Sequence, residues 1–171
     1  MRILGVIVGC WIAAVSLGQV APSISSANLS ASETYCSTTR LSWTSGDGIS
    51  RIVIASEGAP VSSTPQSNQF YIGDNDFGDG YNFSATEFVV YNGSGSLVNL
   101  RKLKSNTTYY FKVIEYNGGG NSYAYRLTNA PSISVTTEDL TGSISVDVSN
   151  QCISGNEFSH TSTVTSTGSD T

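Results

Sequence analysis

The segment Leu103-Lys104-Ser105-Asn106-Thr107-Thr108-Tyr109-Tyr110-Phe111-Lys112-Val113 alternates apolar and polar side chains from Tyr109 onward. A period of two is typical of a β-strand with one buried face, and here it places Tyr109, Phe111 and Val113 on that face. The segment therefore predicts a half-buried strand that follows a polar turn.

A second segment, Arg40-Leu41-Ser42-Trp43-Thr44, alternates in the same way and places Leu41 and Trp43 on one face. The two strands together predict a single buried cluster: Trp43, Tyr109, Phe111 and Val113.

Further strands are expected at residues 23–29, 51–56, 87–91, 97–103 and 132–137, and no window carries a helical stripe. Turn signals separate them at Ser45–Gly48, Asn92–Gly95 and Asn117–Gly120, where glycines are expected to supply positive φ angles. Many short strands joined by such turns predict an all-β, antiparallel sandwich.

The segment from Leu103 to Val113 resembles the sixth strand of fibronectin type III domains together with its lead-in. The resemblance places Tyr109 at the tyrosine corner, where the hydroxyl is tied to the preceding backbone. Leu41-Ser42-Trp43 resembles the second strand with its core tryptophan. Ser105 and Asn106 stand where the family has Pro-Gly, which loosens the turn. An immunoglobulin-like sandwich of the fibronectin type III kind is therefore expected over residues 19–138.

Three further stretches are similar to fibronectin-like modules of large exported Bacteroidota proteins: Arg51–Ala55, Phe88–Gly93 and Val113–Gly118. That likeness spans about residues 22–138. Such modules serve as spacers, adhesive units or enzyme accessories, so the resemblance implies a fold more firmly than a function.

The first 18 residues have the pattern of an export signal. A positive Met1-Arg2 start precedes the apolar run from Ile3 to Leu17, and small residues at positions 16 and 18 place the cut after Gly18. A retained membrane anchor needs about 18 or more apolar residues, and neither this run nor any later stretch is long enough. We expect a secreted or cell-surface protein without a membrane span after cleavage.

Residues 139–171 resemble the incomplete start of a second β-sandwich domain, of the PKD (polycystic kidney disease) type. The resemblance implies that the chain is the N-terminal piece of a longer protein. After signal cleavage, Cys36 and Cys152 remain in an oxidising compartment. They could form a disulfide if their Cα atoms come within about 7 Å of each other.

The formal net charge is −5. Basic residues gather only at Arg101, Lys102 and Lys104, which we interpret as a solvated strand edge. Binding to nucleic acid needs a concentrated basic face, so a nucleic-acid partner is not expected.

The acidic loop Gly73–Gly80 carries Asp74, Asp76 and Asp79, which are a weak calcium candidate because carboxylates are the ligands that Ca²⁺ prefers. The loop lacks the later bidentate glutamate of a calcium hand, so a solvated turn is the favoured interpretation. The single histidine, His160, has no cysteine at zinc-ligand spacing. No cofactor is expected.

No serine lies in a Gly-x-Ser-x-Gly elbow, which argues against a serine hydrolase. A glycosidase pair would have to come from Glu57, Glu87 or Glu115, and Glu115 would reach a cleft only if its strand bent outward. We expect no catalytic residue and no enzymatic activity.

Seven tyrosines exceed what one core needs: Tyr71, Tyr81, Tyr91, Tyr110, Tyr116, Tyr123 and Tyr125. They could form cross-strand pairs within the sheet, or an exposed surface for a carbohydrate or a surface protein. The sequence thus favours a non-catalytic module for adhesion, spacing or binding within a larger surface protein. The alternative is an accessory domain of a secreted hydrolase or peptidase.

Overall fold

The computed structural model describes residues 19–139, and all regular secondary structure in that range is β-strand. The signal-peptide prediction, the PKD-like prediction and Cys152 lie outside the described residues. The strands are β1 (Ala27–Ser32), β2 (Thr39–Thr44), β3 (Ser50–Glu57), β4 (Glu87–Gly93), β5 (Leu97–Leu100), β6 (Thr108–Gly119), β7 (Ser122–Tyr125) and β8 (Ser132–Thr136). Over this range no helix is long and apolar enough to span a lipid bilayer.

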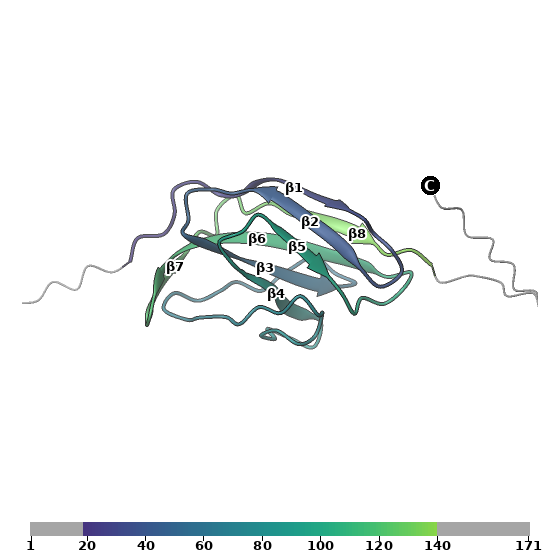
Figure 1. The fold of residues 1–171 in the computed structure, drawn as a ribbon. Coiled ribbons are helices and arrows are strands. Elements are labelled where there is room, and N and C mark those ends of the chain that lie inside the picture. Colours follow the sequence, from purple (N-terminus) through teal and green to yellow (C-terminus); the bar gives the residue numbers. More distant parts are fainter. Residues whose placement is uncertain (1–18, 140–171) are drawn as a thin grey trace, which may run out of the picture.

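The strands form two sheets that pack face to face (Figure 1). One sheet has the order β1-β2-β5. The other has the order β4-β3-β6, and both β7 and β8 pair with the free side of β6. All pairings between these strands are antiparallel. This arrangement confirms the expected immunoglobulin-like sandwich of the fibronectin type III kind.

The inner core fills the space between the two sheets. It contains all four residues expected to be buried together, since Trp43 of β2 packs in one cluster with Tyr109, Phe111 and Val113 of β6. Trp43 also meets Tyr91 edge to face, with the ring centroids 5.4 Å apart. The alternation in the two deciding segments therefore corresponds to the inner faces of both sheets.

The turn before β6 is tied to the strand by the tyrosine corner. The backbone N–H of Lys104 donates to the Tyr109 hydroxyl at 2.9 Å. Asn106, which stands where the resembled family has glycine, adopts a φ of 48°. Asparagine tolerates this left-handed conformation better than most residues, so the turn keeps its shape without Pro-Gly.

The structure moves several predicted boundaries, and one of them is the end of β5, which is Leu100 rather than residue 103. β1 begins at Ala27 rather than at residue 23, because Asp47 holds the preceding segment outside the sheet through the backbone N–H groups of Ser23 (3.1 Å) and Ile24 (2.7 Å). β6 continues to Gly119 and forms a hairpin with β7, a strand that the sequence analysis missed. Its four residues are too few to show a period.

The positive φ angles expected at the first two turns are wrong. Gly118 and Gly120 have them, whereas Gly46 and Gly48 do not. These two glycines are needed for space instead, because a Cβ on Gly48 would lie 2.5 Å from a carboxylate oxygen of Glu115. Two further glycines of the second turn, Gly93 and Gly95, likewise lack positive φ.

We expect Trp43→Ala to lower the free energy of unfolding by about 3–5 kcal/mol, the usual cost of truncating a large buried aromatic side chain. That is a large share of the stability of a small domain. A denaturant titration of both proteins measures the difference. A change below about 1 kcal/mol would show that Trp43 contributes little to the core.

Candidate functional site

The outer face of the β4-β3-β6 sheet is apolar, and the long connection between β3 and β4 packs on it. We call this connection, residues 58–86, the cover. Ile52 and Ile54 of β3 and Ile114 of β6 point to this face and are buried. Tyr71 of the connection packs against them in a second core cluster. Figure 1 shows the connection on the side of this sheet away from β1, β2 and β5. β3 at the centre of the sheet is therefore buried on both faces.

Glu87 at the start of β4 anchors the first part of this cover. Its carboxylate accepts hydrogen bonds from the backbone N–H and the hydroxyl of Ser62, both at 2.8 Å, and from the N–H of Ser63 at 3.0 Å. Burial raises the pKa of the carboxyl, but the hydrogen bonds from Ser63 and Ser62 outweigh it and lower the pKa below its usual value.

Tyrosine hydroxyls anchor the next part of the cover. The Tyr125 hydroxyl donates to the carbonyl of Gln69 at 2.7 Å, and the Tyr71 hydroxyl accepts from the N–H of Gln66 at 2.8 Å. The backbone N–H of Asn68 donates to the carbonyl of Tyr123 at 2.8 Å. Burial raises the pKa of Tyr125, so its hydroxyl stays protonated and able to donate.

Three large apolar side chains project outward from the anchored cover. Phe70 is 46% exposed, Ile72 is 67% exposed and Tyr81 is 42% exposed. The backbone N–H of Tyr81 donates to the carbonyl of Ile72 at 2.8 Å, which places these two residues side by side. The Phe70 ring lies 5.6 Å from that of Tyr123. We call Phe70, Ile72 and Tyr81 the aromatic loop surface.

The predicted tyrosines divide between structure and surface. Tyr71 of the cover is buried in one cluster with Tyr116 and Tyr125 of the sheet, and of the seven tyrosines only Tyr81 is exposed. Sequence analysis did not single out Phe70 or Ile72. Phe70, Tyr71 and Ile72 are all apolar, so only the fold shows that the buried Tyr71 separates two exposed residues.

The acidic loop forms ion pairs with the basic cluster. Arg101 lies 2.6 Å from Asp76, and Lys102 lies 3.1 Å from Asp76 and 2.6 Å from Asp79. Hydrogen bonds from Lys102 and Arg101 lower the pKa of the Asp76 carboxyl. Asp74 accepts a hydrogen bond from the backbone N–H of Asp76 at 2.9 Å. Asp74, Asp76 and Asp79 are thus engaged within the protein, and no metal-binding carboxylate cluster occurs among residues 19–139.

Lys104, the third member of the basic cluster, lies 2.6 Å from Glu57. The three basic residues are therefore paired with carboxylates, while their side chains remain more than half exposed to solvent. At this strand edge each basic side chain therefore lies beside a carboxylate that offsets its charge.

A buried ion pair closes one end of the inner core. Arg51 and Glu115 are directly opposed on β3 and β6, with their charged atoms 3.2 Å apart. The other Glu115 oxygen accepts from the hydroxyl of Ser26 and from the N–H of Gly46 at 2.8 Å. Arg51 also donates to the carbonyl of Gly95 at 2.8 Å.

The outward bend considered for Glu115 is therefore wrong. The side chain stays on the inner face, where every carboxylate oxygen has a partner, because Arg51 lies across the ladder from it. Glu57, Glu87 and Glu115 each have different partners in different parts of the fold. The structure does not bring them together as a pair facing one cleft.

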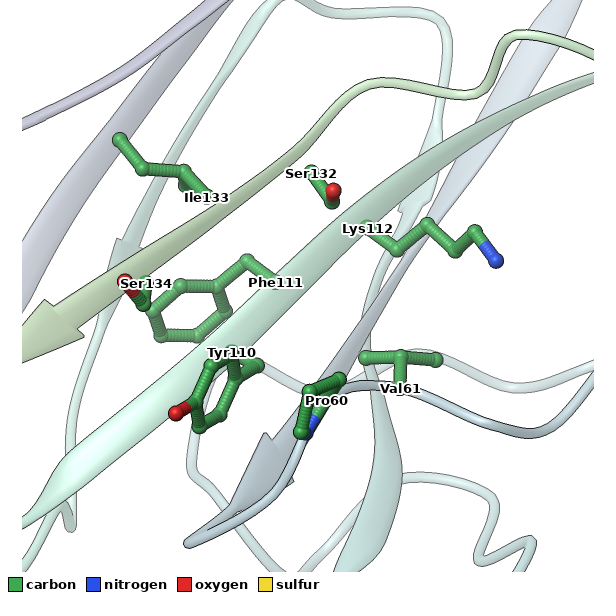
Figure 2. Close-up of a pocket in the computed structure, with 8 residues that line it drawn as sticks. All are labelled: Pro60, Val61, Tyr110, Phe111, Lys112, Ser132, Ile133 and Ser134. Atoms are coloured by element: carbon green, nitrogen blue, oxygen red, sulfur yellow. The ribbon is translucent and has the colours of Figure 1, made fainter.

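A groove opens at the β8 edge, where the cover ends. Its floor is the outer face of β6 and β8, with Tyr110 opposite Ser134 and Lys112 opposite Ser132. Pro60 and Val61 of the cover form the other side, as Figure 2 shows. The cavity volume is about 340 Å³.

Cys36 lies half-buried between β1 and β2. Because Cys152 is not described, the bridge between the two cysteines stays a prediction.

No protein-family model and no curated protein matches the sequence. Three solved structures are similar to the chain over most of their own length. A computationally redesigned β-sandwich protein has 16% identity and a TM-score of 0.45, with 67% of this chain and 95% of that chain covered. The FN5 domain of Drosophila Lar has 15% identity and a TM-score of 0.40, with 67% of this chain and 95% of that chain covered.

The type III domain of human fibronectin type III domain containing protein 3 has 21% identity and a TM-score of 0.42, with 74% and 95% covered. These similarities are low. The fold assignment rests on the strand order and on the tyrosine corner of the chain itself, which define a fibronectin type III-like domain.

We expect Glu87→Gln to lower the free energy of unfolding by about 1–3 kcal/mol at neutral pH, because a partly buried set of charge-assisted hydrogen bonds is weakened. The folded-state pKa of Glu87 lies below its unfolded value. The stabilisation is therefore fully present above the unfolded pKa of about 4.3 and is lost as the pH falls through the folded pKa. Denaturant titrations from pH 7 to pH 2.5 should show the difference between the two proteins shrinking below about pH 4. A pH-independent difference would contradict this role.

Removing the Glu115 carboxylate should be more damaging. We expect Glu115→Ala to cost about 3–5 kcal/mol, since it leaves the Arg51 charge buried without its partner. In the double variant Arg51→Met with Glu115→Leu, much of that stability should return, because no buried charge remains. Thermal unfolding of the two variants gives the comparison. A double variant less stable than Glu115→Ala would contradict the ion-pair interpretation.

Proposed function

We propose that this chain is a non-catalytic, extracellular β-sandwich module that mediates adhesion within a larger surface protein. The carrying observation is the aromatic loop surface of Phe70, Ile72 and Tyr81, exposed on a connection that buried contacts hold in place. Large apolar side chains held in a fixed arrangement bind with little loss of conformational freedom. The residues from 1 to 18 support export, because their pattern is that of a signal peptide.

The partner proposed for this surface is a protein. Ile72 is the most exposed of the three residues, and an aliphatic side chain offers no ring for stacking on a sugar. Aromatic side chains are enriched at protein interfaces, and the energetically dominant ones are surrounded by contacts that exclude water. Tyr81 adds a hydroxyl that can donate at the edge of such an interface.

The non-catalytic assignment is supported by how the acidic groups are used. Glu87 accepts bonds from the cover, Glu115 pairs with Arg51 and Glu57 pairs with Lys104. Each carboxylate satisfies a structural need, and none faces a second acid across a groove. An acid and base pair positioned for hydrolysis would need that arrangement.

A binding experiment with matched variants tests the adhesive role. The purified chain is titrated against immobilised envelope proteins of the source cells, before and after protease treatment and before and after periodate oxidation of glycans. We expect saturable binding that protease abolishes and periodate spares. Phe70→Ser, Ile72→Ser and Tyr81→Ser should each weaken the binding about tenfold or more, as truncation at an interface centre does.

Ile49→Ser is the matched control. Ile49 is similarly exposed, at 59%, but it lies outside the cover, between β2 and β3. It should leave the binding within about twofold. Circular dichroism of every variant confirms that the sandwich is intact. Binding that is equal in all four variants, or that periodate removes, would overturn the proposal.

Hydrolysis assays test the non-catalytic assignment. We expect the purified chain to turn over none of a panel of peptide, glycan and ester substrates. Turnover that disappears on a single substitution in this chain would contradict the assignment.

A further inference from the structure

Lys112 stands apart from the other basic residues. Among the described residues, the remaining lysines and arginines each form an ion pair or a hydrogen bond with the protein. The ammonium group of Lys112 forms neither kind of contact. Lys112 lies on β6, and its side chain projects from the outer face of the sheet. Its charge is therefore available to a ligand.

Two carboxylates that contact segments next to the groove, Glu57 and Glu87, are already engaged. Glu57 at the end of β3 pairs with Lys104 at 2.6 Å. Glu87 accepts bonds from Ser62 and Ser63, directly after the groove residue Val61. Among residues 19–139, no carboxylate forms an ion pair with Lys112.

The lining of the groove is polar at its ends and apolar between them. In Figure 2 the Lys112 ammonium and the Tyr110 hydroxyl lie at opposite ends of the labelled group, with Pro60 and Val61 between them. Ser132 and Ser134 add hydroxyl groups along β8. The cavity of about 340 Å³ is at the lower end of the range of small-molecule sites, roughly 300–1,000 Å³.

A ligand that matches this lining has an apolar ring face, several hydroxyls and one negative charge. A sugar ring carries axial C–H groups that pack on apolar and aromatic side chains, and its hydroxyls exchange hydrogen bonds with serine and tyrosine. Lysine is a compact point charge with three donors, so it pairs with a single carboxylate without needing a bidentate geometry.

We propose that the groove between the cover and β8 binds a saccharide unit that carries a carboxylate, such as a uronic acid. The carboxylate pairs with the Lys112 ammonium, the ring packs on Pro60 and Val61, and the ring hydroxyls bond to Tyr110 and Ser132. This site is separate from the aromatic loop surface of Phe70, Ile72 and Tyr81. The test of this saccharide site is therefore independent of the test of the proposed adhesive role.

The test is a titration of the chain with digalacturonic acid, followed by the shifts of backbone amide signals in NMR spectra. We expect saturable shifts that centre on Lys112, Ser132 and Ser134. The neutral digalactose, which differs by the absence of the carboxylates, should bind at least fivefold more weakly. Raising the salt from 50 to 500 mM should weaken the acidic sugar and leave the neutral one unchanged.

Two variants localise the interaction. Lys112→Gln should weaken digalacturonic acid at least fivefold and leave digalactose within twofold. Ser134→Tyr keeps the charge but fills the groove with a side chain that strands favour, so it should abolish both interactions. Lys102→Gln is the matched control, since it removes the same charge where Asp76 and Asp79 already pair with it.

Several outcomes would overturn the proposal. Shifts that map elsewhere on the domain, equal affinity for the two disaccharides, or equal weakening by Lys112→Gln and Lys102→Gln would each do so. A short acidic peptide that displaces digalacturonic acid and binds more tightly would assign the groove to a protein partner instead. The dispersion of the amide spectrum shows in each case that the variant is folded.

Discussion

The structure depends on the burial of both faces of the sheet formed by β4, β3 and β6. β3 alternates Ile52 and Ile54 on the outer face with Val53 and Ala55 on the inner face, and all four are buried. The second layer, β1-β2-β5, covers only the inner face. The outer isoleucines would otherwise meet water, so the connection between β3 and β4 has to fold over them.

That constraint explains why an irregular connection has fixed polar anchors. Loop backbone packed against an apolar face must still satisfy its N–H and C=O groups. The Glu87 carboxylate accepts hydrogen bonds from the N–H groups of Ser62 and Ser63, while the Tyr125 hydroxyl donates to the carbonyl of Gln69. The buried polar groups under the cover therefore hold in place the backbone that carries the exposed residues Phe70, Ile72 and Tyr81.

Sequence patterns predicted the inner core but not the cover. Trp43 and Tyr109 lie in strands whose period of two is visible in the sequence, and the segment from Leu103 to Tyr109 also predicts the tyrosine corner. Residues 58–86 have no period, because their backbone bonds in turn to β6, β7, β4 and the turn before β6 rather than to one neighbouring strand. Nothing local distinguishes Tyr71, which is buried, from Tyr81, which is exposed. The difference arises only when the connection folds onto the sheet.

The pairing of charges could not be predicted from the sequence either. The acidic run at Asp76 and the basic run at Arg101 were recognised separately in the sequence, as a weak metal candidate and as a strand edge. The fold joins them through a bridge between these two residues, so each explains the charge of the other. Arg51 and Glu115 are likewise far apart in sequence but opposed in the ladder.

Lys112 is notable because the other described lysines and arginines are engaged in contacts with the protein. It occupies an outward position of the deciding strand, where a solvated lysine is ordinary. Its neighbours across the ladder, Ile54 on β3 and Ser132 on β8, carry no charge. The cover that buries the outer face stops short of β8 and leaves Lys112 at the margin of a groove.

Both candidate ligand surfaces thus follow from one requirement, the burial of the outer isoleucines. The outer side of the cover carries the apolar surface, and its boundary forms the charged groove. Substitution at either surface leaves the inner core untouched, so ligand preference can change there without loss of the sandwich.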